Sequence, residues 1–399
     1  MSWVTLRQFR WTTRTGPDDL PLVYGIAPYG DLRKLPVDVA DVILVNAMAP
    51  TASLRIEYAT RVDELRLLRS CLLDKADGAL HLAGGGFASS SPHVRRFVSE
   101  SFGLGMLSAA VQSAYEWVAG PDALRDFDAL PVSLARKYAK SRVRPDLLFR
   151  TADLLLAGEA RGRSSRPAAS TLQQEKRLNT LLPWVDAHKQ PLVMTWAHLT
   201  EAGVTVNLYS SAEGGSWLDA PIGESRPPSS NLYLDVPTED VPTEDVPADD
   251  VPAGAAGDAR APVDPDGPPG AGPDAERPPP RSTGPGSAEA MFSAGRETLP
   301  LLTRQLYASA PETPVRLADR RLRGRWVPVD PVHPDRGTFL LGVLEEPLSP
   351  RDGRVLTERL RARNRDVAVA GGVTVAVRDR LLVATSALRE GQPWDLLVD

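Results

Sequence analysis

Two acidic residues on neighbouring predicted strands stand out in this sequence, because their types and spacing could do chemistry. Asp146 follows Pro145, and Glu159 begins the triplet Glu159-Ala160-Arg161. Side chains alternate along a strand, so Glu159 and Arg161 share one face while Ala160 points to the other. Carboxylate oxygens are the ligands that magnesium prefers. A bound divalent metal activates water and neutralises charge in phosphodiester hydrolysis. Two carboxylates on adjacent strands could therefore hold such a metal.

The segments around these acids read as alternating helices and strands. In chain order, we expect a helix over 104–118, strands over 144–150 and 153–163, a helix over 171–189, and strands over 191–196 and 204–209. Pro183 is expected to kink the helix over 171–189 or to end it early. Earlier in the chain, residues 22–26 and 42–45 predict strands because they are short apolar runs rich in β-branched residues. The spacing of apolar residues over 61–73 predicts a helix.

This pattern resembles the signature of the PD-(D/E)XK nucleases over roughly residues 104–210. The resemblance implies a restriction-endonuclease-like α/β fold, a mixed sheet flanked by helices. It also implies Mg²⁺ or Mn²⁺ held by Asp146 and Glu159. In that family the preceding helix often brings an acid toward the metal, which is Glu116 here. The following helix often carries a glutamine, and Gln173 and Gln174 occupy that position.

Arg161 departs from the pattern, because the family usually has a lysine there to orient or deprotonate the attacking water. Arginine stays protonated and cannot act as a base, although it can hold a phosphate or stabilise negative charge. Two outcomes stay open. Either another lysine substitutes, with Lys176 on the next helix the nearest candidate, or the site has lost hydrolysis and keeps only binding.

A basic run precedes the acids. Residues 121–190 hold 13 Lys or Arg against 8 Asp or Glu, which suits a polyanion such as DNA. The residues that could follow a nucleic-acid backbone are Arg136, Lys137, Lys140, Arg142 and Arg144. An ordinary solvated connector would show the same composition, so both interpretations stay open.

Composition divides the chain into four segments. We expect an N-terminal α/β extension over 1–100, the nuclease-like core over 101–220, a linker over 221–288 and a C-terminal α/β module over 289–399. The linker is rich in Pro, Gly and Asp; such a segment buries too little apolar surface to order itself, and it could act as a spacer or as a docking tail. The elements expected in the C-terminal module are helices over 291–307 and 354–365 and strands over 338–344, 367–370, 373–377 and 381–385.

Several features predict a cytoplasmic protein with no membrane segment. Cys71 is the only cysteine, so no intramolecular disulfide can form, which fits a reducing compartment. No run of about 18 apolar residues occurs, as a membrane-spanning helix would need. The first residues contain no apolar stretch of the signal-peptide kind.

These observations favour a metal-dependent nuclease that acts on DNA, in restriction, phage defence or repair. The alternative is a non-catalytic adaptor, in which a degenerate nuclease fold binds nucleic acid or a protein partner through the linker or the C-terminal module. A metal bound between Asp146 and Glu159 would favour the enzyme. A buried salt bridge between Glu159 and Arg161 that closes the cleft would favour the adaptor.

Overall fold

The structure is a computed structural model of the 399-residue chain. It describes residues 2–16, 20–49, 56–74, 78–83, 87–115, 117, 124–126, 144–151, 155–164, 170–188, 190–211, 298–330, 337–364, 373–386 and 393–397. The predictions for Glu116, Arg136, Lys137, Lys140 and Arg142 lie outside the described residues. The same holds for the linker over 221–288 and the strand expected over 367–370.

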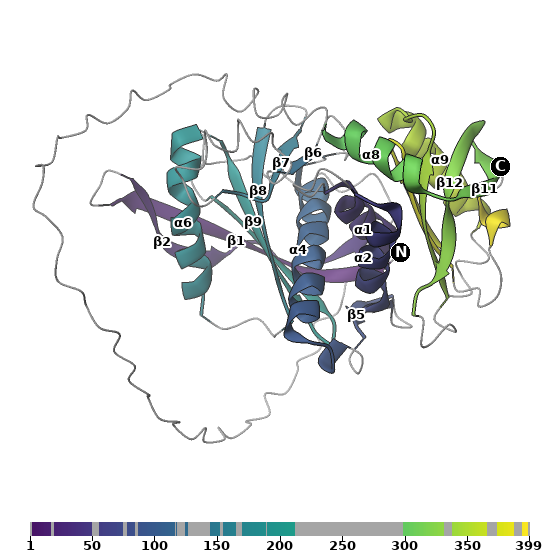
Figure 1. The fold of residues 1–399 in the computed structure, drawn as a ribbon. Coiled ribbons are helices and arrows are strands. Elements are labelled where there is room, and N and C mark those ends of the chain that lie inside the picture. The colour runs from purple at the N-terminus through teal and green to yellow at the C-terminus, as the bar shows by residue number, and fades with distance from the viewer. Residues whose placement is uncertain are drawn as a thin grey trace, which may run out of the picture. The chain divides into compact units, whose positions relative to one another are not determined.

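The first part of the chain is mixed α/β (Figure 1). Its helices are α1 (Val39–Met48), α2 (Tyr58–Ser70), α4 (Pro92–Tyr115) and α6 (Leu172–His188). Its strands are β1 (Ser2–Thr15), β2 (Pro21–Pro28), β3 (Arg33–Val37), β4 (Leu72–Asp74), β5 (Leu80–Leu82), β6 (Leu124–Asp126), β7 (Leu147–Arg150), β8 (Leu155–Arg163), β9 (Leu192–Leu199) and β10 (Val204–Ser211). The expected helices and strands around the two acids are confirmed, with shifted ends.

Eight of these strands form one mixed sheet in the order β2-β1-β10-β9-β8-β7-β6, with β3 also paired to β1. Strands β6, β7 and β8 are antiparallel neighbours, β9 runs parallel to β8, and β10 runs antiparallel to β9. Strand β1 then pairs in parallel with β10. The crossover from β8 to β9 is helix α6, the connection that a parallel strand pair needs.

Helices α4 and α6 cover opposite faces of this sheet. Successive side chains of β8 therefore point to different helices. Leu156 packs in the same core cluster as α4, and Ala157 packs in the cluster that holds the buried face of α6. Helix α4 lies very close to β8, because a Cβ at Gly162 would stand 1.5 Å from the carbonyl oxygen of Ser99. Only glycine fits there, so this contact fixes the height of α4 over the strand that carries Glu159.

Helix α6 covers the other face of the sheet and continues beyond Pro183 to His188. Of the two outcomes predicted for this proline, an early end of the helix is therefore wrong. Pro183 is exposed, while Leu178, Leu181 and other apolar side chains of α6 are buried against the sheet. Asn179 also anchors the helix, because its Oδ1 accepts a hydrogen bond of 2.7 Å from the Val23 amide in β2. Packing of this kind outweighs the one backbone hydrogen bond that proline removes.

The strand predicted over residues 42–45 is also wrong, because these residues lie in α1. The Asp38 side chain accepts a hydrogen bond of 2.8 Å from the Ala40 amide and so caps the helix. Every residue of α1 except Asp41 is buried, since α1 contacts α4 on one side and strands β14 (Thr374–Arg378) and β15 (Leu381–Ser386) on another. A helix enclosed in this way is apolar all round and gives no amphipathic pattern.

The C-terminal part adds a five-stranded antiparallel sheet in the order β11-β12-β13-β15-β14. Its further elements are α8 (Thr298–Ser309), β11 (Glu312–Leu317), β12 (Arg320–Pro328), β13 (Thr338–Leu344), α9 (Pro350–Arg363) and the short helix η4 (Trp394–Leu396). Helix α9 packs in a core on one face of this sheet. Residues on the opposite face of the sheet belong to the same core cluster as α1. Residues 1–227 and 284–399 accordingly form one compact unit.

None of the helices in the described ranges combines the length and the apolar character needed to span a membrane.

Candidate functional site

The two predicted acids meet where β7 begins beside the middle of β8. The Asp146 amide donates a hydrogen bond of 2.9 Å to the Gly158 carbonyl, which continues the antiparallel pairing of the two strands. The Asp146 side chain turns back onto β8, and its Oδ2 accepts a hydrogen bond of 2.8 Å from the Ala160 amide. Asp146 is thereby held next to Glu159, as the sequence predicted for adjacent strands.

Glu159 is fully buried, at 0% exposure. Its Oε1 atom contacts Arg161 Nη2 at 2.5 Å, Arg177 Nη2 at 2.6 Å and Arg177 Nε at 2.7 Å. Its Oε2 atom is buried and has no hydrogen-bond partner among the described residues. A buried carboxylate oxygen without a donor is costly, so this atom needs a proton or a cation.

The electrostatics of the acid pair agree with that requirement. Burial, and after it the charge of Asp146, raises the pKa of Glu159 from 4.5 to about 7, against the lowering effects of Arg161 and Arg177. Burial also raises the pKa of Asp146, while the hydrogen bond from the Ala160 amide and the charges of Arg161 and Arg177 oppose the rise. Two carboxylates cannot donate to each other when both are ionised, so a shared proton or a bound cation is what relieves the pair.

Arg177 is the site residue that the sequence interpretation missed. It lies on α6 with its side chain 24% exposed, and it contacts Glu159 from across the sheet face. Its signal was present, because Gln174, Arg177, Leu178 and Leu181 recur at the three- and four-residue spacing of one helix face. The sequence prediction assigned only the apolar residues of this helix face to the buried side.

The other predicted residues on α6 divide by face. Gln174 is buried at 5% exposure and points inward, whereas Gln173 and Lys176 are exposed. The structure therefore brings Arg177, and not Lys176, to the acid pair. Arg144, the described member of the predicted basic run, is half-buried just before Asp146.

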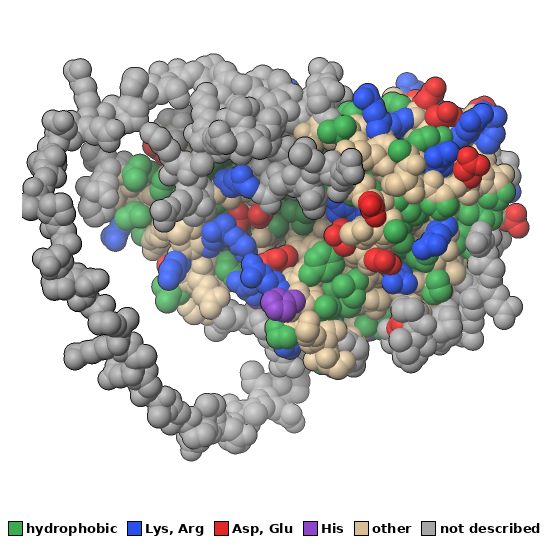
Figure 2. Space-filling model, viewed as in Figure 1, with side chains coloured by type: hydrophobic (Ala, Val, Ile, Leu, Met, Phe, Trp, Pro, Cys, Tyr) green, Lys and Arg blue, Asp and Glu red, His purple; other side chains and the backbone are tan. Residues whose placement is uncertain are grey.

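Further basic side chains occur on β8 and on the viewed face of the molecule. Figure 2 shows Lys and Arg side chains gathered over the part of the viewed face between α6 and α4, with acidic side chains among them. Arg163 follows Arg161 on the same face of β8, and its guanidinium lies 5.5 Å from the centre of the Trp196 ring. Positive charge next to a buried acid pair suits a ligand that carries phosphate groups.

The residues present fit a divalent cation with two protein ligands. No group of three or more His, Cys, Asp or Glu side chains that could enclose a metal occurs within the described ranges. Magnesium, however, is commonly bound by one or two carboxylates with water and substrate phosphate completing its shell. Asp146 and the unpartnered Oε2 of Glu159 supply such a pair.

Comparison of the chain with models of protein families, with curated proteins and with solved structures finds no match. Its function therefore has to be argued from the geometry of the site.

Proposed function

We propose that this protein is a metal-dependent nuclease with a restriction-endonuclease-like core, and that Asp146 and Glu159 hold its divalent metal. The observation that carries the proposal is the buried acid pair, in which Glu159 Oε2 has no hydrogen-bond partner within the part of the chain that the structure describes. Buried polar groups are normally satisfied, and exceptions concentrate where an ion or a catalytic step accounts for them. The order of elements supports the same proposal: β6, β7 and β8 as a meander, α6 as the crossover, and β9 parallel to β8.

Bound Mg²⁺ or Mn²⁺ would activate water and neutralise the charge that develops on the scissile phosphate. The chain's own residues then have distinct tasks. Asp146 and Glu159 hold the cation, with Asp146 oriented by the Ala160 amide. Arg161 is 27% exposed and Arg177 is 24% exposed, so both guanidinium groups border on solvent and can contact a phosphate there. Neither arginine can accept a proton at neutral pH.

A second candidate function is supported by a different observation. The salt bridge between Arg161 and Glu159 that would favour a binding protein is present, and Arg177 strengthens it at the same oxygen. A site that uses its acid to position two arginines could bind a phosphodiester without cutting it. The guanidinium groups of Arg161 and Arg177 border on solvent, and the buried Oε2 atom has no hydrogen-bond partner among the described residues, so a cation would satisfy it; for this reason we place hydrolysis first.

The test is cleavage of plasmid and linear DNA with Mg²⁺ or Mn²⁺, combined with calorimetric titration of Mn²⁺ into the protein. We expect Asp146→Asn and Glu159→Gln to lower the cleavage rate by at least about 100-fold, as loss of a metal ligand does, and to weaken Mn²⁺ binding. Glu201→Gln, which changes an exposed acid near the end of β9, should behave like the wild type.

Wild-type protein that binds DNA in a gel-shift assay but never cuts it would establish the second candidate instead. Cleavage that survives in both Asp146→Asn and Glu159→Gln would overturn the site itself.

A further inference from the structure

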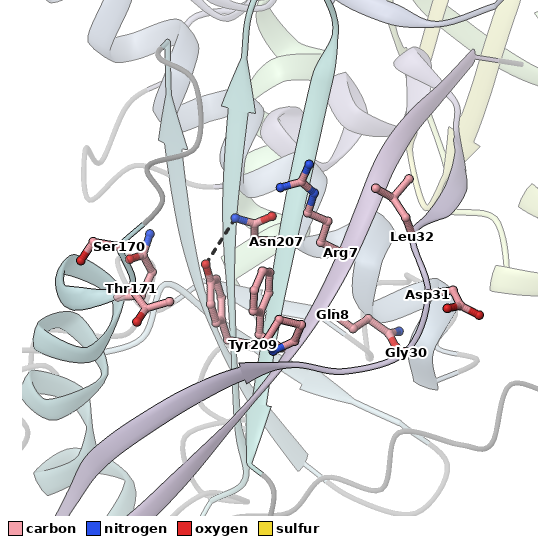
Figure 3. A pocket seen from close by; sticks show the side chains of 12 residues that line it. Arg7, Gln8, Gly30, Asp31, Leu32, Ser170, Thr171, Asn207 and Tyr209 are labelled. Carbon is pink, nitrogen blue, oxygen red and sulfur yellow. Dashed lines mark hydrogen bonds between the residues drawn. The ribbon is translucent and has the colours of Figure 1, made fainter. Parts of the chain in front are cut away.

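A separate pocket opens beside the acid pair. It has a volume of about 350 Å³ and lies between the start of α6, the strands β1 and β10, and the loop that follows β2 (Figure 3). Its size falls at the lower end of the range of about 300–1,000 Å³ for small-molecule pockets.

The floor of the pocket holds two buried amide groups with unsatisfied oxygens. Gln174 and Asn207 are each 5% exposed, and neither Gln174 Oε1 nor Asn207 Oδ1 has a hydrogen-bond partner among the described residues. Asn207 is oriented by its own Nδ2, which donates a hydrogen bond of 3.3 Å to Tyr209 Oη (Figure 3). Two acceptors that line one pocket and lack donors indicate a ligand that brings N–H groups.

One wall of the pocket is aromatic. Phe9 of β1 and Tyr209 of β10 are cross-strand partners, and their rings stack with centroids 5.0 Å apart and planes 19° from parallel. Arg7 and Asp31 lie on the exposed rim. An aromatic wall, buried amides and a rim arginine together suit a planar heterocycle attached to a phosphate.

The pocket and the acid pair belong to one continuous sheet face. Gln174 and Arg177 are one helical turn apart on α6, so one lines the pocket while the other contacts Glu159. Across the strands, Arg161 pairs with Trp196, Trp196 with Asn207, and Asn207 with Arg7. At about 4.8 Å per strand, Asn207 lies roughly 10 Å from Arg161, which is within the reach of one nucleotide.

From this geometry we infer that the pocket receives one unpaired nucleobase with an exocyclic amino group, taken from the strand whose phosphates lie at Arg161. This inference rests on the proposed nucleic-acid function and adds to it the kind of base that the pocket binds. An amino group has two hydrogens, one for Gln174 Oε1 and one for Asn207 Oδ1, whereas a ring carbonyl would face both oxygens and be repelled. Arg7 binds the phosphate next to that base. The negative charge of Asp31 repels phosphate from the part of the pocket rim where Asp31 lies.

The test measures binding without cleavage, by fluorescence anisotropy in EDTA, using labelled oligo(dC) and oligo(dU). Cytosine and uracil are alike in size and differ in the group that the two amides would read. We expect the wild type to bind oligo(dC) roughly three- to tenfold more tightly than oligo(dU), as one or two neutral hydrogen bonds provide. Gln174→Met and Asn207→Leu should each reduce that preference, because each change removes an acceptor for the amino group of cytosine and relieves the repulsion of the uracil carbonyl. Thr180→Ala, an exposed change on the same helix, is the matched control.

Titrations with dCMP and dUMP separate a strand from a free nucleotide. A preference for dCMP in protein that binds no strand would assign the pocket to a free nucleotide and overturn the strand part of the inference. Equal affinity for oligo(dC) and oligo(dU) would overturn the base pocket and leave the nuclease proposal standing, because that proposal is judged by cleavage in Asp146→Asn. Absence of binding to any strand or nucleotide would likewise overturn the base pocket, while cleavage with Mg²⁺ or Mn²⁺ would still decide the nuclease proposal.

Discussion

Two centres in this molecule pair two acids with two arginines, and they differ in one respect. At the junction between α1 and the C-terminal sheet, Asp38 contacts Arg361 at 2.5 Å, and Asp41 contacts Arg378 at 2.8 Å and Arg361 at 3.5 Å. With the Ala40 amide on the other oxygen of Asp38, each of the four carboxylate oxygens at this junction has a partner. At the candidate site, by contrast, Glu159 Oε2 has none among the described residues.

A shifted pKa does not separate the two centres. Burial, followed by the charge of Asp41, raises the pKa of Asp38 to about 6, and burial with Asp146 raises that of Glu159 to about 7. Desolvation acts on both in the same way. What differs is the carboxylate oxygens. All four at the junction have a partner, although Arg378 Nη1 has none among the described residues, whereas Glu159 keeps one oxygen that a ligand could use. We therefore predict that the ion pairs at the junction between α1 and the C-terminal sheet stabilise the fold, whereas the acid pair at the candidate site destabilises it.

The largest loss of stability is expected at the junction. Arg361→Ala removes the partner of Asp38, one contact of Asp41 and a hydrogen bond of 2.9 Å to the Val375 carbonyl. Removal of one member of a buried ion pair is strongly destabilising, and because Arg361 is 27% exposed we expect a loss of about 2 kcal/mol in the free energy of unfolding, measured with urea.

Arg354→Ala is the matched control for this change, since Arg354 is exposed on the same helix. DNA cleavage and binding should stay at the wild-type level in Arg361→Ala. A loss of cleavage in a folded Arg361→Ala protein would contradict the division of tasks between the two centres.

The next effect has the opposite sign and depends on pH. Folding raises the pKa of Glu159 from 4.5 to about 7, so the folded protein holds this proton more tightly than the unfolded chain. The resulting contribution to stability is complete below pH 4.5 and is lost as the pH rises through 7. Glu159→Gln avoids that loss. We expect the variant to be more stable than the wild type at pH 8, by at most about 3 kcal/mol, and nearly equal to it at pH 5.

Urea unfolding at both pH values in EDTA measures this difference, with Glu201→Gln as the control. A destabilised Glu159→Gln protein at pH 8 would mean that the ion pairs with Arg161 and Arg177 outweigh the cost of burial. Glu159 would then resemble Asp38, and the contrast between the two centres would fail.

The smallest expected effect concerns Arg161. Arg161→Lys introduces a side chain that can give up a proton when it is desolvated, so we expect the rate of DNA cleavage to rise about tenfold, which is below the roughly 100-fold at which acid–base contributions usually begin. Cleavage kinetics with Mg²⁺ at several pH values measure this, and a new pH-dependent step would accompany the gain. A fall in rate would instead show that the fork of the guanidinium is needed to hold Glu159 or the phosphate.

The sequence by itself determined those features that depend on neighbours along the chain. Strand alternation places Glu159 and Arg161 on one face, and the expected strand over 338–344 is β13. The segments around Asp146 and Glu159 pair as adjacent strands because a short connection joins them. Periodicity also predicts the helix that follows, since its apolar residues repeat at helical spacing.

Only the tertiary structure decided the rest. The 14-residue strand β1 was not predicted, and its parallel pairing of Leu6 with Val206 joins segments that are far apart in the sequence. Helix α1 was mistaken for a strand because enclosure on all sides removes the amphipathic pattern. The contact of Arg177 with Glu159 and the pocket between Gln174 and Asn207 likewise depend on how α6 packs on the sheet. Local sequence patterns predict which face of a helix or strand a side chain lies on. They do not predict which distant element it contacts, because that depends on the burial of apolar residues over the whole fold.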